Sequence, residues 1–115
     1  MEKGLSPHGK TTINKSGGAQ TEVDGRYDLV PGSAISRIAE VAGAGARKYA
    51  ANNWRLIPYE EHINHALMHL AALLEDDTQD DHLGHALCRL AFAVAVETPE
   101  HRFKDITAGL SEGAQ

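Results

Sequence analysis

Two histidine pairs are the residues of this sequence whose types and spacing point most directly to chemistry. His65 and His69 lie four positions apart, which places both imidazoles on one face of a helix. His82 and His85 lie three positions apart, with the same consequence. The residues between the pairs include five acids: Glu75, Asp76, Asp77, Asp80 and Asp81. Two facing helices that carry imidazoles and carboxylates can form a metal site inside a helical bundle.

The same residues also fit a role without a bound ion. Histidine can occupy the polar flank of an amphipathic helix, and the acids could form a solvated turn. If the cluster does bind a metal, carboxylates suit Mg²⁺ or Mn²⁺, whereas neutral imidazole suits a softer ion such as Co²⁺ or Zn²⁺. The residues alone leave both interpretations open.

A second candidate is the segment of residues 45–55, which gathers cations, amides and aromatic rings. Its members with functional side chains are Arg47, Lys48, Tyr49, Asn52, Asn53, Trp54 and Arg55. Cations can pair with phosphate oxygens, amides can contact a base or sugar, and aromatic rings can stack on a base. The alternative is a helix C-terminus whose cations interact with the dipole and whose rings belong to the core. For the two rings we favour this alternative.

The helices that must position these residues follow from apolar periodicity and from breakers. The pattern predicts helices over about residues 34–49, 59–75 and 80–96, with Ser33 as the cap of the first. The short acidic turn makes the last two an antiparallel hairpin. The apolar stripes expected to form the core are Ile63, Ala66, Leu67, Leu70, Leu73 and Leu74, then Leu83, Leu87, Leu90, Ala91 and Val94.

Composition sets the domain organisation and excludes several classes of protein. We expect a flexible arm over residues 1–24, one all-α domain over 25–105 and a tail over 106–115, with no strands. The net charge of -5 argues against a nucleic-acid polymer as partner. No apolar run could span a bilayer, and the single Cys88 indicates no disulfide, so we expect a cytoplasmic protein. A chain this short favours a homo-oligomer.

Several motifs in fixed order resemble those of a phage protein family, the dATP/dGTP diphosphohydrolase N-terminal family. They lie within residues 27–97 and are Asp28-Leu29-Val30-Pro31, Gly45-Ala46-Arg47-Lys48-Tyr49, Asn53-Trp54-Arg55, His69-Leu70 and His82-Leu83-Gly84-His85-Ala86. No phosphate-binding glycine loop, nucleophile elbow or His-Glu-x-x-His motif competes with this resemblance.

The resemblance implies a small all-α bundle of the MazG type and a function in nucleotide hydrolysis. Such enzymes use divalent ions, Mg²⁺ or Mn²⁺, to split dATP or dGTP into a nucleoside monophosphate and pyrophosphate. In phages with 2-aminoadenine genomes, this reaction would remove dATP and supply dGMP. The substrate would be a purine nucleotide in the host cytoplasm, with neither membrane nor nucleic acid as partner.

The resemblance also assigns roles to individual residues. The substrate-binding residues would be Lys48, Asn53, Trp54 and Arg55. The metal-binding residues would be His69, Glu75, Asp81, His82 and His85, with Asp81 and His85 also catalytic.

This sequence departs from the family pattern at points that matter for catalysis. Met68 stands where the pattern has an arginine, the acidic turn is shorter, and the Glu-x-x-Glu of MazG-type enzymes is absent around His65 and His69. Imidazole is a poor Mg²⁺ ligand. Three alternatives to an Mg²⁺ or Mn²⁺ hydrolase therefore remain. They are a hydrolase that uses a softer ion, a phage protein that sequesters a nucleotide signal, and a helical interaction module.

Overall fold

A computed structural model describes residues 10–102, which fall into two compact units. The boundary between the units lies between Ile35 and Ser36. The predicted tail, residues 106–115, lies outside the described residues, as do the first nine residues of the predicted arm. Within the described part, no helix combines the length and apolar character needed to cross a membrane.

The first unit contains a short β-hairpin that the sequence analysis did not predict. Strands β1 (Thr11–Ile13) and β2 (Ala19–Thr21) pair in antiparallel fashion. The Asn14 side chain accepts hydrogen bonds from the backbone N–H groups of Ser16 and Gly18, at 3.0 and 2.9 Å, and so fixes the turn. Both strands are fully exposed, which explains why no alternation of apolar and polar residues announces them.

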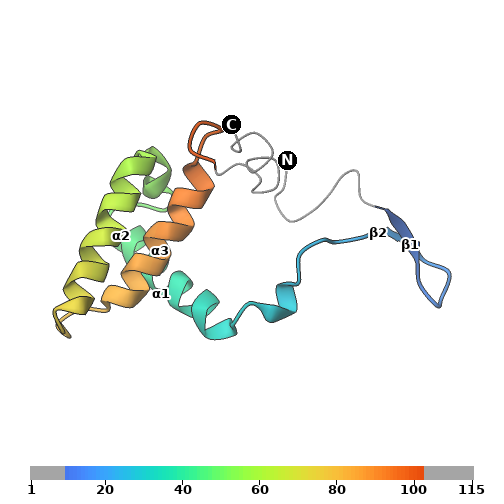
Figure 1. Ribbon diagram of the computed structural model, residues 1–115, viewed down its shortest axis with the longest axis horizontal. Coiled ribbons are helices and arrows are strands. Elements are labelled where there is room, and N and C mark those ends of the chain that lie inside the picture. The colour runs from blue at the N-terminus through green and yellow to red at the C-terminus, as the bar shows by residue number, and fades with distance from the viewer. Residues whose placement is uncertain (1–9, 103–115) are drawn as a thin grey trace, which may run out of the picture. The chain divides into compact units, whose positions relative to one another are not determined.

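Helices make up the rest of the described chain, and the predicted all-α class is confirmed (Figure 1). In chain order they are η1 (Tyr27–Leu29), α1 (Gly32–Lys48), η2 (Asn53–Leu56), α2 (Tyr59–Leu74) and α3 (His82–Val96). Helix α1 starts in the first unit and ends in the second. Ser33 lies inside its first turn, so the prediction of Ser33 as the cap was wrong. Helices α2 and α3 pack side by side as the predicted antiparallel hairpin (Figure 1).

The seam between α2 and α3 consists of small and histidine side chains. Helix α2 buries His62, Ala66 and His69, which recur at helical spacing. Helix α3 buries His82, Ala86 and Ala93 at helical spacing, while its buried Gly84 and Cys88 lie beside Arg37 and Ile38 of α1. Alanine allows the two backbones to approach closely, and hydrogen bonds satisfy the ring nitrogens of His69 and His82 that lie in the seam.

Several of the leucines predicted to form the core lie outside this seam. Leu67 is 58% exposed and Leu74 85%, while Leu83 and Val94 on α3 are 52% and 54% exposed. The predicted stripe was correct for Ala66, which is buried, and wrong for these exposed side chains, because His62 and His69 share the buried face with Ala66. Leu67 follows Ala66 directly, and one residue turns a helix by about 100°. The second unit thus keeps an apolar surface on its outside.

His62 ties η2 to α2 from inside the seam. Its side chain is fully buried, and its Nε2–H donates to the carbonyl oxygen of Trp54 at 3.0 Å. Burial lowers the pKa of the imidazole below its ordinary value of 6.5, against the opposing effect of the hydrogen bond to Trp54, and the nearby Arg89 and His65 lower it further. His62 is therefore neutral in the folded chain at neutral pH.

We predict that His62 makes the fold less stable in mild acid. Below about pH 6.5 the unfolded chain binds a proton that folded His62 does not, so the free energy of unfolding falls as pH falls, by up to about 1.4 kcal/mol per pH unit. His62→Gln keeps a donor for Trp54 but does not titrate. Urea unfolding at pH 7.5, 6.5 and 5.5 should show a smaller decline for the variant. Equal declines in both proteins would contradict this role.

Helix α3 begins at a cap formed by Asp81. The Asp81 carboxylate accepts a hydrogen bond from the backbone N–H of Gly84 at 3.0 Å and lies 3.3 Å from Nε of Arg37 on α1. Gly84 is buried, and a Cβ in its place would collide with that carboxylate. Asp81 therefore has a structural role at the start of α3.

We predict that Asp81→Ala lowers the free energy of unfolding by about 1 kcal/mol, because the cap is lost. Asp81→Asn is the matched variant, since asparagine caps helices about as well as aspartate. Its stability should stay within about 0.5 kcal/mol of the wild type, because the exposed pair with Arg37 contributes little. Chemical denaturation measures both values, and equal losses in the two variants would refute the cap.

Candidate functional site

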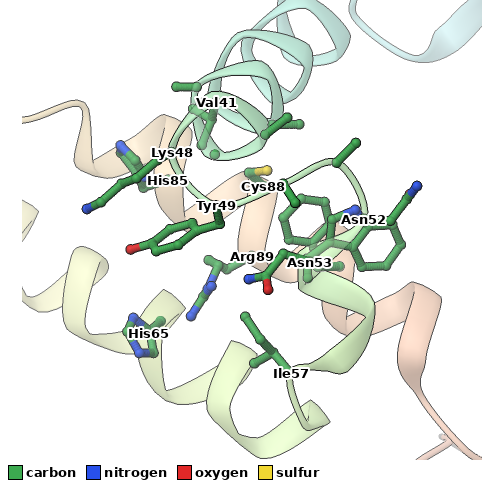
Figure 2. Close-up of a pocket in the computed structure, with 18 of the residues that line it drawn as sticks. Val41, Lys48, Tyr49, Asn52, Asn53, Ile57, His65, His85, Cys88 and Arg89 are labelled. Atoms are coloured by element: carbon green, nitrogen blue, oxygen red, sulfur yellow. The ribbon is translucent and has the colours of Figure 1, made fainter.

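A pocket of about 910 Å³ opens between the end of α1, the segment that contains η2, and helices α2 and α3 (Figure 2). Every residue that lines it belongs to the second unit. Pockets of several hundred cubic ångströms are the usual size for small-molecule sites. This pocket is large enough for a nucleotide.

Polar side chains reach the pocket from four parts of the chain. The end of α1 and the loop after it supply Lys48, Tyr49 and Asn52, and η2 supplies Asn53. Helix α2 supplies Glu61, His65 and His69, and helix α3 supplies His85 and Arg89. The apolar part of the wall includes Val41, Ile57, Cys88 and Phe92. A concave, partly apolar wall with a few convergent polar groups is typical of a ligand site.

Trp54 belongs to the packing of the pocket wall. Its ring stacks on Phe92 with centroids 4.4 Å apart and an interplanar angle of 2°. The Arg55 guanidinium lies over the same ring, 4.3 Å from its centroid. These two contacts occupy much of the ring of Trp54, so packing within the chain accounts for it. Tyr49, which is 65% exposed, is more accessible than Trp54 and Phe92.

Arg89 is a pocket residue that the sequence analysis missed. Figure 2 shows its side chain in the middle of the pocket, pointing toward the side where His65 lies. Its Nε is buried and has no hydrogen-bond partner. Burial also lowers the pKa of this guanidinium below its usual value. The available signal was its position four residues after His85, a cation within the apolar run of α3.

One group among the described residues could hold a metal ion, and it adjoins the pocket. A potential ligand atom from each of His69, Asp80 and His82 lies within 4.8 Å of the other two. His69 belongs both to this group and to the pocket wall. Its pKa is lowered by burial and by the neighbouring His85 and His82, which favours the neutral imidazole that binds metals.

The hydrogen bonds of His82 define its tautomer. Its Nε2 lies 3.0 Å from Oδ2 of Asp77, and because a carboxylate only accepts, Nε2 carries the proton. Nδ1 of neutral His82 therefore has a free lone pair, which accepts from Nδ1–H of His69 at 2.9 Å. A histidine that donates to a carboxylate and offers its other nitrogen is the usual arrangement around a bound metal.

The spacing and chemistry of this group fit a transition ion. On a tetrahedral ion, two imidazole nitrogens at bonds of about 2.0 Å stand about 3.3 Å apart, so the 2.9 Å pair of His69 and His82 needs only a small separation, with the proton of His69 moved from Nδ1 to Nε2. Two imidazoles with one carboxylate suit Mn²⁺, Co²⁺ or Zn²⁺ better than Mg²⁺, which prefers oxygen ligands.

His85 connects the pocket with the metal-binding group. Its ring stacks on that of His69, with centroids 4.9 Å apart and an interplanar angle of 18°. Its Nε2 lies 3.5 Å from Oδ1 of Asp80. His85 lines the pocket as well, so it stands where it could exchange a proton with a bound molecule.

The residues proposed from the sequence thus divide into two sets. The structure brings Lys48, Asn53, Trp54, His69 and His85 to the pocket wall, and His82 to the metal-binding group. Arg55 is exposed and lies over Trp54, and Glu75 caps the end of α2. Asp81 caps α3, whereas the neighbouring Asp80 faces the histidines.

Comparison with known proteins bears on this arrangement. No curated protein and no solved structure gives a significant match to the chain. The profile of one protein family, described as dATP/dGTP diphosphohydrolase, N-terminal, matches residues 14–106, which include the whole pocket and the metal-binding group. This match covers most of the sequence, so the chain belongs to the dATP/dGTP diphosphohydrolase N-terminal family.

Proposed function

We propose that this chain is a metal-dependent pyrophosphohydrolase that converts dATP or dGTP into the nucleoside monophosphate and pyrophosphate. The observation that carries the proposal is the contact between two features: a nucleotide-sized pocket and a His-Asp-His group that share His69. The family to which the chain belongs is described as dATP/dGTP diphosphohydrolase, N-terminal, which names the same two nucleotides. A bound nucleotide and a bound ion would thus lie next to each other at His69.

The pocket residues support binding of a purine nucleotide. Lys48 presents an ammonium group that can pair with phosphate oxygens. Asn53 offers an amide for a base edge or sugar, and Tyr49 offers a ring for stacking. Arg55 and Trp54 were also expected to bind substrate. They would act indirectly, by holding in place the part of the pocket wall to which Asn53 belongs.

The metal-binding group supports hydrolysis by an activated water. We propose His69, Asp80 and His82 as the ligands, and Asp77 as the residue that orients His82. A bound divalent ion would supply Lewis acidity and lower the pKa of a coordinated water. His85, between the group and the pocket, is placed to accept the proton of that water. Glu75 and Asp81 remain sequence predictions with structural contacts of their own.

We predict that the purified chain releases pyrophosphate from dGTP or dATP with Mn²⁺, Co²⁺ or Zn²⁺, and more slowly with Mg²⁺. His82→Ala should abolish the reaction, and Asp77→Asn should reduce metal affinity or activity about 10- to 100-fold, because the orienting carboxylate is lost. His101→Ala, at an imidazole that pairs with Glu60 outside the pocket, is the control and should retain activity.

Mass spectrometry of products and bound ligand distinguishes the outcomes. Monophosphate and pyrophosphate in equal amounts support hydrolysis. Recovery of an intact, tightly bound nucleotide under every ion would contradict hydrolysis and indicate sequestration. Wild-type rates in His82→Ala would show that the metal-binding group has no part in the reaction.

We also propose that a second copy of the chain covers the apolar surface of α2 and α3. In the described residues the fully buried apolar side chains are Ala66, Ala86, Cys88 and Ala93, which form a small core. Leucines remain exposed on the outside of both helices, at spacings of seven residues: Leu67 with Leu74, and Leu83 with Leu90. Two such helix pairs facing each other would form a bundle core of ordinary size.

We predict that the wild type is a dimer or larger oligomer at micromolar concentration in light scattering coupled to size-exclusion chromatography. The double substitution Leu67→Glu with Leu74→Glu should shift it to a monomer, because it places two charges in the proposed interface. Leu29→Glu, at an exposed leucine of η1, is the matched control and should leave the mass unchanged. A wild type that is monomeric at this concentration would overturn the proposal.

A further inference from the structure

The geometry points to Arg89 as the residue that binds the phosphate chain of the nucleotide, an inference that rests on the proposed substrate class. Arg89 lies on α3 one helical turn after His85, so both side chains reach the pocket from the same helix. Figure 2 shows the guanidinium in the pocket interior.

The guanidinium of Arg89 has a donor that lacks an acceptor in the folded chain. Its Nε is shielded from solvent and has no hydrogen-bond partner. No acid among residues 10–102 forms an ion pair with it, and Glu61 is the carboxylate of the pocket wall whose charge acts on it. A buried donor without an acceptor costs stability, so an anion that supplies the missing acceptor would be favoured.

The side chains around Arg89 in the pocket also favour an anion. The pocket wall also carries Lys48, His65 and His85, all of which can donate to an anion, whereas Glu61 is the one acid that lines it. Arginine presents a planar fork of donors that matches two oxygens of a phosphate. With two cations, Lys48 and Arg89, against one acid, the pocket has a local excess of positive charge, although the whole sequence has a net charge of -5 that by itself would repel a nucleotide.

Arg89 is linked to the metal-binding group through His85. His85, which precedes it by one turn, stacks on His69, a member of that group. A phosphate chain held by Arg89 could therefore extend past His85 toward the ion. Base and sugar would then occupy the part of the pocket lined by Tyr49 and Asn53.

The test compares ligands with and without phosphate. Calorimetric titration in the presence of Mn²⁺ would use the α,β-methylene analogue of dGTP, inorganic tripolyphosphate and deoxyguanosine. Arg89→Gln should weaken binding of the analogue and of tripolyphosphate about 10- to 100-fold, and leave deoxyguanosine unchanged. Arg89→Lys should retain part of the affinity, because it keeps the charge but not the fork. Arg26→Gln, at an exposed arginine paired with Asp28, is the control.

Thermal unfolding of the ligand-free proteins gives a second readout. Removing a partly buried charge whose Nε has no acceptor should leave the Tm of Arg89→Gln unchanged or raise it, whereas a purely structural arginine would lower it. Equal weakening of all three ligands, or a lowered Tm without selective loss of the phosphate ligands, would overturn the inference. Arg89→Lys carries the test if the glutamine variant does not fold.

The outcomes separate this inference from the proposed function. Wild-type affinity in both Arg89 variants, in a chain that hydrolyses dGTP, would refute only the role of Arg89. Phosphate-selective binding that depends on Arg89, in a chain that never releases pyrophosphate, would refute only the hydrolase. A wild type that binds none of the three ligands would refute both.

Discussion

The close approach of α2 and α3 is the constraint on which the site depends. The helices meet through alanine and histidine side chains, so imidazoles that would ordinarily face water enter the seam. Each then needs a partner inside the protein: His62 finds the Trp54 carbonyl, and His69 finds His82. These hydrogen bonds hold η2 against α2 and place two imidazole nitrogens beside each other. The packing of the hairpin and the construction of the site are one and the same arrangement.

The site separates two kinds of charge along the pocket. Cationic groups, Lys48 and Arg89, lie on the wall where no acid forms an ion pair with them among the described residues, whereas Asp77 and Asp80 contact the histidines. Such a division suits a substrate that has a negatively charged chain at the reacting end. It also explains how an acidic chain can present a surface suited to an anion.

Much of the fold could be predicted from the sequence, because periodicity and breakers mark the helices. The limits of α2 and the turn before α3 agree with the structure to within two residues. The rotation of each helix about its own axis, and so the face that it buries, could not be predicted. Hydrophobicity favoured Leu67 and Leu74 as core beside Ala66, but packing buried His62 and His69 with Ala66 instead, since side-chain size and hydrogen bonding decided the seam. The hairpin was missed because its one local signal is the Asn14 turn.

For the site, it was easier to predict which kinds of side chain take part than which partners each of them contacts. His69, His82 and His85 come together as their helical spacing suggested, and Lys48 and Asn53 reach the same pocket. Asp80 and Asp81 cannot be distinguished by sequence, because only the backbone geometry at the start of α3 decides which carboxylate caps the helix. Arg89 escaped notice since a lone cation within an apolar run has no motif around it.

Trp54, packed between Phe92 and Arg55, also gives the protein a built-in optical probe. It is the single tryptophan of the sequence, so the intrinsic fluorescence excited at long wavelength arises from one ring in the pocket wall. The cation over that ring and the Trp54 carbonyl bound by His62 couple its emission to the placement of η2. The filling of the pocket can thus be followed by light, in real time and without a label.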